Sequence, residues 1–104
     1  MAGYLNWDWE LEIKFNPQEL GGDPYQIFFF LGPVPSSPSE WLYAPSRMFE
    51  PVTSHIGNPI TEYRSINGVL EHHCGREIKD DEVLPYLRKN FSWRVKKVRG
   101  STVR

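Results

Sequence analysis

The 104-residue chain has few cysteines, little net charge and no long apolar run, the features by which a sequence most readily indicates its class of protein. It has one cysteine, so no disulfide can form within the chain, which is typical of a reducing compartment. Its 12 basic and 13 acidic residues nearly cancel, so no charge excess favours binding to nucleic acid. The longest apolar run is too short to span a membrane, and no signal-like apolar segment follows the first residues. These absences predict a cytoplasmic protein that binds neither nucleic acid nor membranes.

Aromatic residues, in contrast, make up 14% of the chain and include four tryptophans. A chain of this length forms one domain with a modest core. We therefore expect part of the aromatic surface to form a binding face. Residues 1–104 are interpreted as a single domain, and residues 97–104 as a frayed tail.

Two strands are predicted in the first third of the chain. Apolar and polar residues alternate over residues 5–15, which indicates a half-buried strand. Residues 27–31 are all apolar and bulky, which indicates a strand buried on both faces. A turn at residues 21–24 (GGDP) separates the two strands, and we expect them to pair as a hairpin. Trp7, Trp9 and Trp93 are expected to share one core.

The second half of the chain predicts two short helices and a final strand. The strand pattern of residues 47–53 is short and interrupted by Pro51, which predicts an edge strand or extended loop. A loop over residues 54–59 is expected to follow. Residues 66–73 show the apolar spacing of a helix that stops at Gly75. A second helix is capped by Asp80 or Asp81, and proline 85 must lie in or near its first turn. We expect its buried side to comprise Val83, Leu84 and Leu87.

Apolar and polar residues alternate over residues 91–95, which predicts the last strand. The predicted fold is mainly β, an antiparallel β-sandwich or small barrel with two short helices.

The segment with the most specific pattern is residues 25–45, which read YQIFFFLGPVPSSPSEWLYAP. Gly32-Pro33 ends the strand, because proline cannot donate a backbone hydrogen bond within a sheet. The prolines that follow stiffen the segment and bring Trp41 and Tyr43 to the surface. Together with Met48 and Phe49, they are the candidate residues for binding a ligand or partner. The alternative is that these aromatic residues close the open end of the sandwich as part of the core.

This segment resembles the C-terminal β-domain of fungal tyrosinases and polyphenol oxidases, in which an FFLG-P-VP turn precedes a Trp and an Ala-Pro pair. The residues DEVLPYL (81–87) and FSWRV (91–95) resemble the closing helix and last strand of that family, so the resemblance covers about residues 4–98. It implies a non-catalytic domain of the melanin-forming enzymes that masks the hydrophobic, copper-bearing pocket of a tyrosinase-like catalytic domain. An aromatic side chain of the domain would enter that pocket, and Phe49 is our first candidate.

The resemblance also bears on metal binding. The catalytic domains of this family hold two copper ions with six histidines, whereas this chain has only His55, His72 and His73. We therefore expect copper only in the associated catalytic domain, no cofactor in this chain, and no oxidation of phenols at a dicopper centre by this chain alone. Many family members also carry a Cys-x-x-Cys pair implicated in copper loading, but this chain has only Cys74. His72 and Cys74 are the metal-ligand candidates, although neighbouring helical residues point about 100° apart.

Two further functions stay open. A stand-alone small enzyme or ligand-binding protein of fungal secondary metabolism would bind a small aromatic ligand in an aromatic pocket. Its acid–base candidates are His55, His72, His73, Glu50 and Tyr43. An assembly module would instead use the exposed edge of its sheet. The basic side chains near the C-terminus are expected to form a solvated strand face, or alternatively an anion site; they are Arg94, Lys96, Lys97 and Arg99.

We predict that the untagged, purified chain contains no stoichiometric copper or zinc, because it lacks both the histidine set and the Cys-x-x-Cys pair. Elemental analysis tests this. One tightly held ion per chain that is lost on changing His72 or Cys74 would contradict it.

Overall fold

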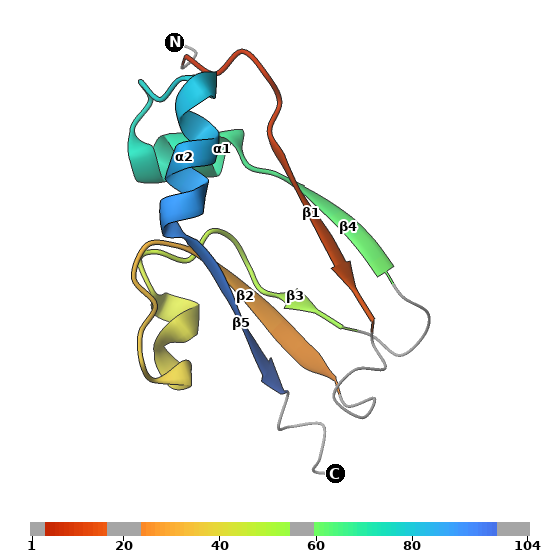
Figure 1. The fold of residues 1–104 in the computed structure, drawn as a ribbon. Helices are drawn as coiled ribbons and strands as arrows, with labels where there is room; N and C mark the ends of the chain where they lie inside the picture. The colour runs from red at the N-terminus through yellow and green to blue at the C-terminus, as the bar shows by residue number, and fades with distance from the viewer. Residues whose placement is uncertain (1–3, 17–23, 55–59, 98–104) are drawn as a thin grey trace.

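A computed structural model describes residues 4–16, 24–54 and 60–97 (Figure 1). The predicted turn at residues 21–24 lies almost wholly outside these ranges, as do most of the predicted loop at 54–59 and of the predicted tail. The elements in chain order are β1 (Glu10–Phe15), β2 (Tyr25–Leu31), the 3-10 helix η2 (Pro38–Tyr43), β3 (Val52–Thr53), β4 (Ile60–Ser65), α1 (Asn67–Cys74), α2 (Asp80–Asn90) and β5 (Phe91–Lys97).

The described strands form two antiparallel sheets rather than a closed barrel. One sheet has the order β1-β4 and the other the order β3-β2-β5. Ile13 and Phe15 of β1 share a buried cluster with Ile27 and Phe29 of β2, so the apolar faces of the two sheets pack together. The predicted sandwich is therefore confirmed, and β3 lies at a sheet edge as expected. Figure 1 shows α1 and α2 together at one end of the two sheets.

The predicted hairpin between the first two strands is wrong. β1 pairs with β4, from Glu10 opposite Ser65 to Phe15 opposite Ile60, whereas β2 lies between β3 and β5. A strand buried on both faces is most stable in the middle of a sheet, with neighbours on each side. A half-buried strand such as β1 covers that sheet from the opposite layer instead. The sequence analysis also missed β4, because its residues, ITEYRS, are mostly polar.

Strand β2 contributes residues to both of the hydrophobic clusters found among the described residues, as its apolar run predicts. Its alternate residues Ile27, Phe29 and Leu31 belong to the main cluster between the sheets. Phe28 and Phe30 point to the other face, where η2 covers them, and Phe30 is fully buried.

Trp41 of η2 is the centre of this second cluster. Its ring lies 5.6 Å from the ring of Phe28 and 6.4 Å from that of Phe30, both edge-on. Its indole nitrogen donates a hydrogen bond of 2.9 Å to the carbonyl of Pro35. The hydroxyl of Ser46 donates to the carbonyl of Pro33, and Gly32 adopts a φ of 120°, which favours glycine. These contacts fold the proline-rich segment back onto β2.

Both predicted helices are present. Helix α1 ends at Gly75 as expected, and Leu70 is its fully buried residue. On α2, Val83 is fully buried and Leu87 partly buried, but Leu84 is 48% exposed, so the prediction for Leu84 is wrong. Pro85 is the sixth residue of α2 and lies in the second turn, where its ring removes only the bond to the carbonyl of residue 81.

The start of the predicted first strand is also wrong: the strand begins at Glu10, and side chains of α1 and α2 bind the chain before it. The carboxylate of Asp80 does not cap α2 but accepts hydrogen bonds from the Trp9 indole and the Asn6 backbone, each 2.9 Å. The Asn67 side chain binds the backbone of Trp7 and Trp9, at 2.8 and 2.7 Å. Among the described residues, the bond from the N–H of Ile66 to the carbonyl of Trp9, at 2.9 Å, is the last backbone bond between these two segments, because the side chains of Asp80 and Asn67 bind the backbone before it.

The three tryptophans consequently do not share one core. Trp7 is 67% exposed and Trp93 is 55% exposed, whereas Trp9 is partly buried against the main cluster. Neither α1 nor α2, nor any other helix in the described ranges, is long and apolar enough to cross a membrane.

Replacing the buried Trp41 is expected to cost much more stability than replacing the exposed Trp7. We expect Trp41→Ala to lower the free energy of unfolding by about 3–5 kcal/mol, because it empties an aromatic core site. Trp7→Ala should change it by less than about 1 kcal/mol. Guanidinium denaturation followed by circular dichroism measures both. Equal losses would show that η2 does not form a core with β2.

Candidate functional site

The four predicted binding residues of the aromatic segment lie in different environments. Trp41 is 8% exposed, Met48 is 7% exposed and Tyr43 is 80% exposed. Trp41 belongs to the cluster on the η2 face of β2, whereas Met48 and Phe49 belong to the main cluster on the opposite face. The four residues therefore do not form one continuous aromatic face.

Phe49 is held at the edge of the main core. Its ring lies 5.5 Å from the ring of Phe29, and the guanidinium carbon of Arg64 lies 5.9 Å from its centroid. A ring covered on two sides in this way has little surface left to offer a partner.

Tyr43, in contrast, is presented by a fixed segment. It is the last residue of η2, and Ala44 after it and Trp41 two residues before it are both buried, although Leu42 is exposed. The backbone N–H of Ala44 also donates to the carbonyl of Trp41, at 3.3 Å. Burial on both sides of Tyr43 fixes its backbone and leaves the phenol ring in solvent.

The acid–base candidates that the structure describes are not assembled into a catalytic group. Glu50 is exposed and pairs with Arg47 at 3.2 Å, and His55 lies outside the described residues. Only His72 and His73 are in ring contact, with centroids 5.0 Å apart. Partial burial, with a smaller effect of the His72 charge, lowers the pKa of His73, so it is uncharged at neutral pH.

The residues around Cys74 form a polar hollow between α1 and α2 that sequence reasoning did not find. Its cavity is about 360 Å³ and is lined by Cys74, Glu77, Ile78, Glu82 and Tyr86. Burial raises the pKa of Tyr86 to about 12, and a hydrogen bond between its hydroxyl and Cys74 adds to the rise. Burial also raises the pKa of Cys74, although this hydrogen bond opposes the rise. Cys74 is therefore a thiol, not a thiolate, at neutral pH, and a poor nucleophile.

A model of the tyrosinase C-terminal domain family matches residues 8–104, nearly the whole chain. The chain belongs to the tyrosinase C-terminal domain family. No curated protein and no solved structure matches it significantly.

The described residues of this tyrosinase C-terminal domain do not fit a copper centre. Within residues 4–16, 24–54 and 60–97, no three His, Cys, Asp or Glu side chains are grouped closely enough to hold a metal ion. Cys74 faces Tyr86, and His73 hydrogen-bonds the backbone of Arg47. The metal-ligand candidate Cys74 is thus engaged by a group that is not a metal ligand, and the other candidate, His72, is in ring contact with His73.

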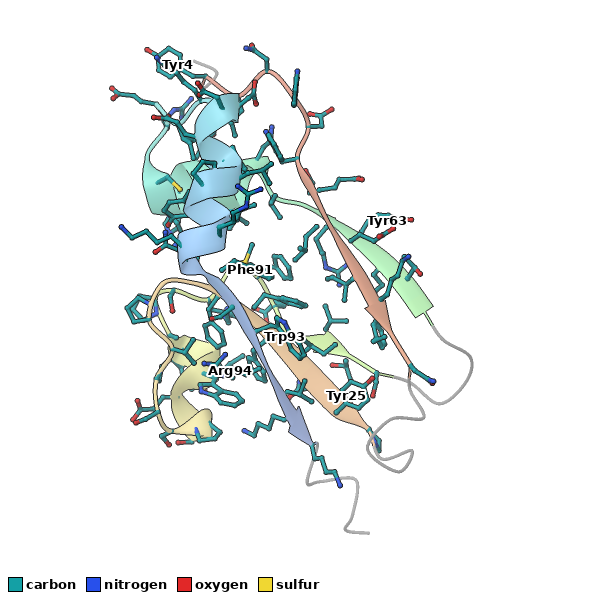
Figure 2. All side chains as sticks on the ribbon, in the orientation of Figure 1. Tyr4, Tyr25, Tyr63, Phe91, Trp93 and Arg94 are labelled. Carbon is teal, nitrogen blue, oxygen red and sulfur yellow. The ribbon has the colours of Figure 1, made fainter. Side chains whose placement is uncertain are left out.

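A second hollow of this domain is apolar and lies between the sheets, on the side where β1 and β5 are the outer strands. Figure 2 shows Phe91 and Trp93 on the side of β5 that faces β1, and Arg94 on the side of η2. Sequence reasoning missed it because β1 and β5 are far apart in the chain and meet only in the folded domain.

The thiol of Cys74 is expected to react slowly. Because burial raises its pKa, the rate of alkylation by iodoacetamide should rise with pH around a midpoint above about 8.5, the value of a free cysteine. Tyr86→Phe removes the hydrogen bond that lowers this pKa, so the midpoint should rise further. Mass spectrometry of samples alkylated at a series of pH values measures both. A midpoint at or below 8.5 in the unmodified chain would contradict the burial of the thiol.

Proposed function

We propose that this tyrosinase C-terminal domain covers the active-site pocket of a tyrosinase-like catalytic domain, and that Tyr43 is the aromatic side chain that enters the pocket. Family membership supports the association with tyrosinase. The observation that carries the choice of residue is the 80% exposure of Tyr43 on an anchored segment.

The order of the segment before binding favours this role. The hydrogen bond from Trp41 to Pro35 and the packing of Trp41 on Phe28 already fix the backbone. Little further conformational entropy is lost when such a segment meets a partner. Exposed, rigidly held aromatic residues are typical of the side chains that dominate binding interfaces.

The chemistry of Tyr43 also suits a pocket that accepts phenols. A phenol ring has the shape and polarity of a phenolic substrate, so it can occupy the same pocket and exclude that substrate. Phe49, our first candidate from the sequence, packs on Phe29 and Arg64 instead. Its entry into a pocket would require those contacts to break.

We expect the isolated chain, added in trans to a purified tyrosinase catalytic domain, to inhibit phenol oxidation competitively, raising KM without changing kcat. A separate chain lacks the high effective concentration of a linked domain, so the titration should extend to about 1 mM. Tyr43→Ala should weaken inhibition at least tenfold, which corresponds to about 1.4 kcal/mol. Its effect on the free energy of unfolding should be within about 0.5 kcal/mol, because the ring is exposed.

The matched control is Tyr63→Ala, which removes another exposed tyrosine, 57% accessible, on β4. It should leave inhibition unchanged. Absence of inhibition by the unmodified chain would refute the covering role. Loss of inhibition in a folded Phe49→Ala variant, with Tyr43→Ala still inhibitory, would refute the assignment of Tyr43.

A further inference from the structure

An apolar groove lies between the free edges of the two sheets. Among the described strands, β1 has a strand neighbour only in β4, and β5 only in β2. Two adjoining cavities of about 320 and 270 Å³ lie on this side of the sandwich. They share Leu11 of β1 and Phe91 of β5 among their lining residues, so they form one groove that follows the strands.

The groove is mainly apolar, although four charged residues also line it: Glu10, Glu12, Lys14 and Arg88. Its part between the sheets is lined mainly by Leu11, Ile13, Ile27, Phe29, Phe91 and Trp93. Trp93 is 55% exposed, and Leu84, at the α2 end of the groove, is 48% exposed. Large apolar side chains gathered in an exposed groove indicate a surface that another molecule covers.

The shape of the covering group follows from the free edges. The edge of a sheet presents backbone N–H and C=O groups, and an extended strand is the structure that pairs with a row of them. A helix or a compact small molecule would fill the apolar part but leave the edge groups without partners. The groove therefore fits an extended segment that adds a strand to β5.

The charges on β5 determine the composition of that segment. Arg94 and Lys96 alternate with Trp93 and Val95, so they lie on the same face of the sheet as Phe28, away from the groove. The ion pairs found within the described ranges are Glu12–Lys14, Arg47–Glu50 and Glu62–Arg64, and none includes Arg94 or Lys96. The guanidinium of Arg94 donates a hydrogen bond of 2.8 Å to the carbonyl of Trp93 but has no acidic partner among these pairs. A strand bound beside β5 would place every second side chain next to these two cations.

We propose that the free edge of β5 binds an extended segment of a partner protein in which apolar and acidic residues alternate. The apolar side chains lie in the groove against Phe91 and Trp93, and the acidic side chains lie beside Arg94 and Lys96. This inference does not depend on the covering role, since Tyr43 is part of η2 and does not line the groove.

The same charges disfavour a second copy of this chain as the occupant of the β5 edge. Two β5 strands paired antiparallel around residue 95 would place Arg94 of each copy opposite Lys96 of the other, and pairing around residue 94 would place the two Arg94 side chains opposite each other. Like charges directly opposite one another destabilise a strand pair.

The test uses two synthetic nine-residue peptides, one alternating valine with glutamate and the other valine with lysine. Isothermal titration calorimetry measures affinity, and hydrogen exchange followed by NMR identifies the protected amides. We expect the glutamate peptide to bind at least tenfold more tightly than the lysine peptide, to slow exchange in β5, and to lose affinity with added salt.

Two variants make the assignment specific. Arg94→Glu combined with Lys96→Glu should reverse the preference in favour of the lysine peptide. Trp93→Lys should abolish binding of the glutamate peptide without lowering thermal stability, because Trp93 is 55% exposed. Tyr43→Ala is the matched control and should bind the glutamate peptide as the unmodified chain does.

The proposal is overturned if neither peptide binds up to about 1 mM, the weak end of measurable affinities. It is also overturned if the double charge reversal leaves the preference unchanged. Sedimentation showing a dimer whose β5 amides are already protected would assign the groove to a second copy instead. Each of these results leaves the inhibition assay with Tyr43→Ala unaffected, so failure here is distinct from failure of the covering role.

Discussion

The burial of β2 on both faces is the constraint on which the rest of the structure depends. Five consecutive apolar residues, 27–31, point alternately to opposite sides, so each side of the strand must be covered by a different part of the chain. The sheet of β1 and β4 covers one side, and η2 covers the other. The position of β2 between β3 and β5 completes its hydrogen bonding.

The two candidate binding surfaces are consequences of how each face of β2 is covered. On the η2 face, Trp41 fills the cluster of Phe28 and Phe30, and this anchoring fixes the exposed Tyr43 two residues later. On the other face, the sheet of β1 and β4 has only two strands, so it leaves an open groove beside β5. The first surface presents a ring to a pocket, and the second presents a pocket and an edge to a strand. The two surfaces thus suit partners of different shape.

The ionisable side chains with shifted pKa values, by contrast, make hydrogen bonds to other residues of the domain. Asp80 holds the N-terminal segment through Trp9, and this hydrogen bond is the main reason that its pKa is lowered. Cys74 and Tyr86 hydrogen-bond each other, and the pKa values of both are raised, chiefly by burial. Such groups are poorly suited to transfer protons or attack substrates at neutral pH.

The sequence by itself determined the elements whose signal is local. The apolar run of β2, the alternation of β5, the helix ending at Gly75 and the family-specific FFLG turn were all readable, because each depends on neighbouring residues. The sequence did not determine which strands pair, since β1 and β4 meet through backbone groups that every residue carries. It also could not show that the side chains of Asp80 and Asn67 hydrogen-bond the chain before Glu10, or that Trp41 is buried while Tyr43 is exposed. Those outcomes were decided only by the tertiary structure, because each depends on contacts between distant segments or on which face of η2 packs against β2.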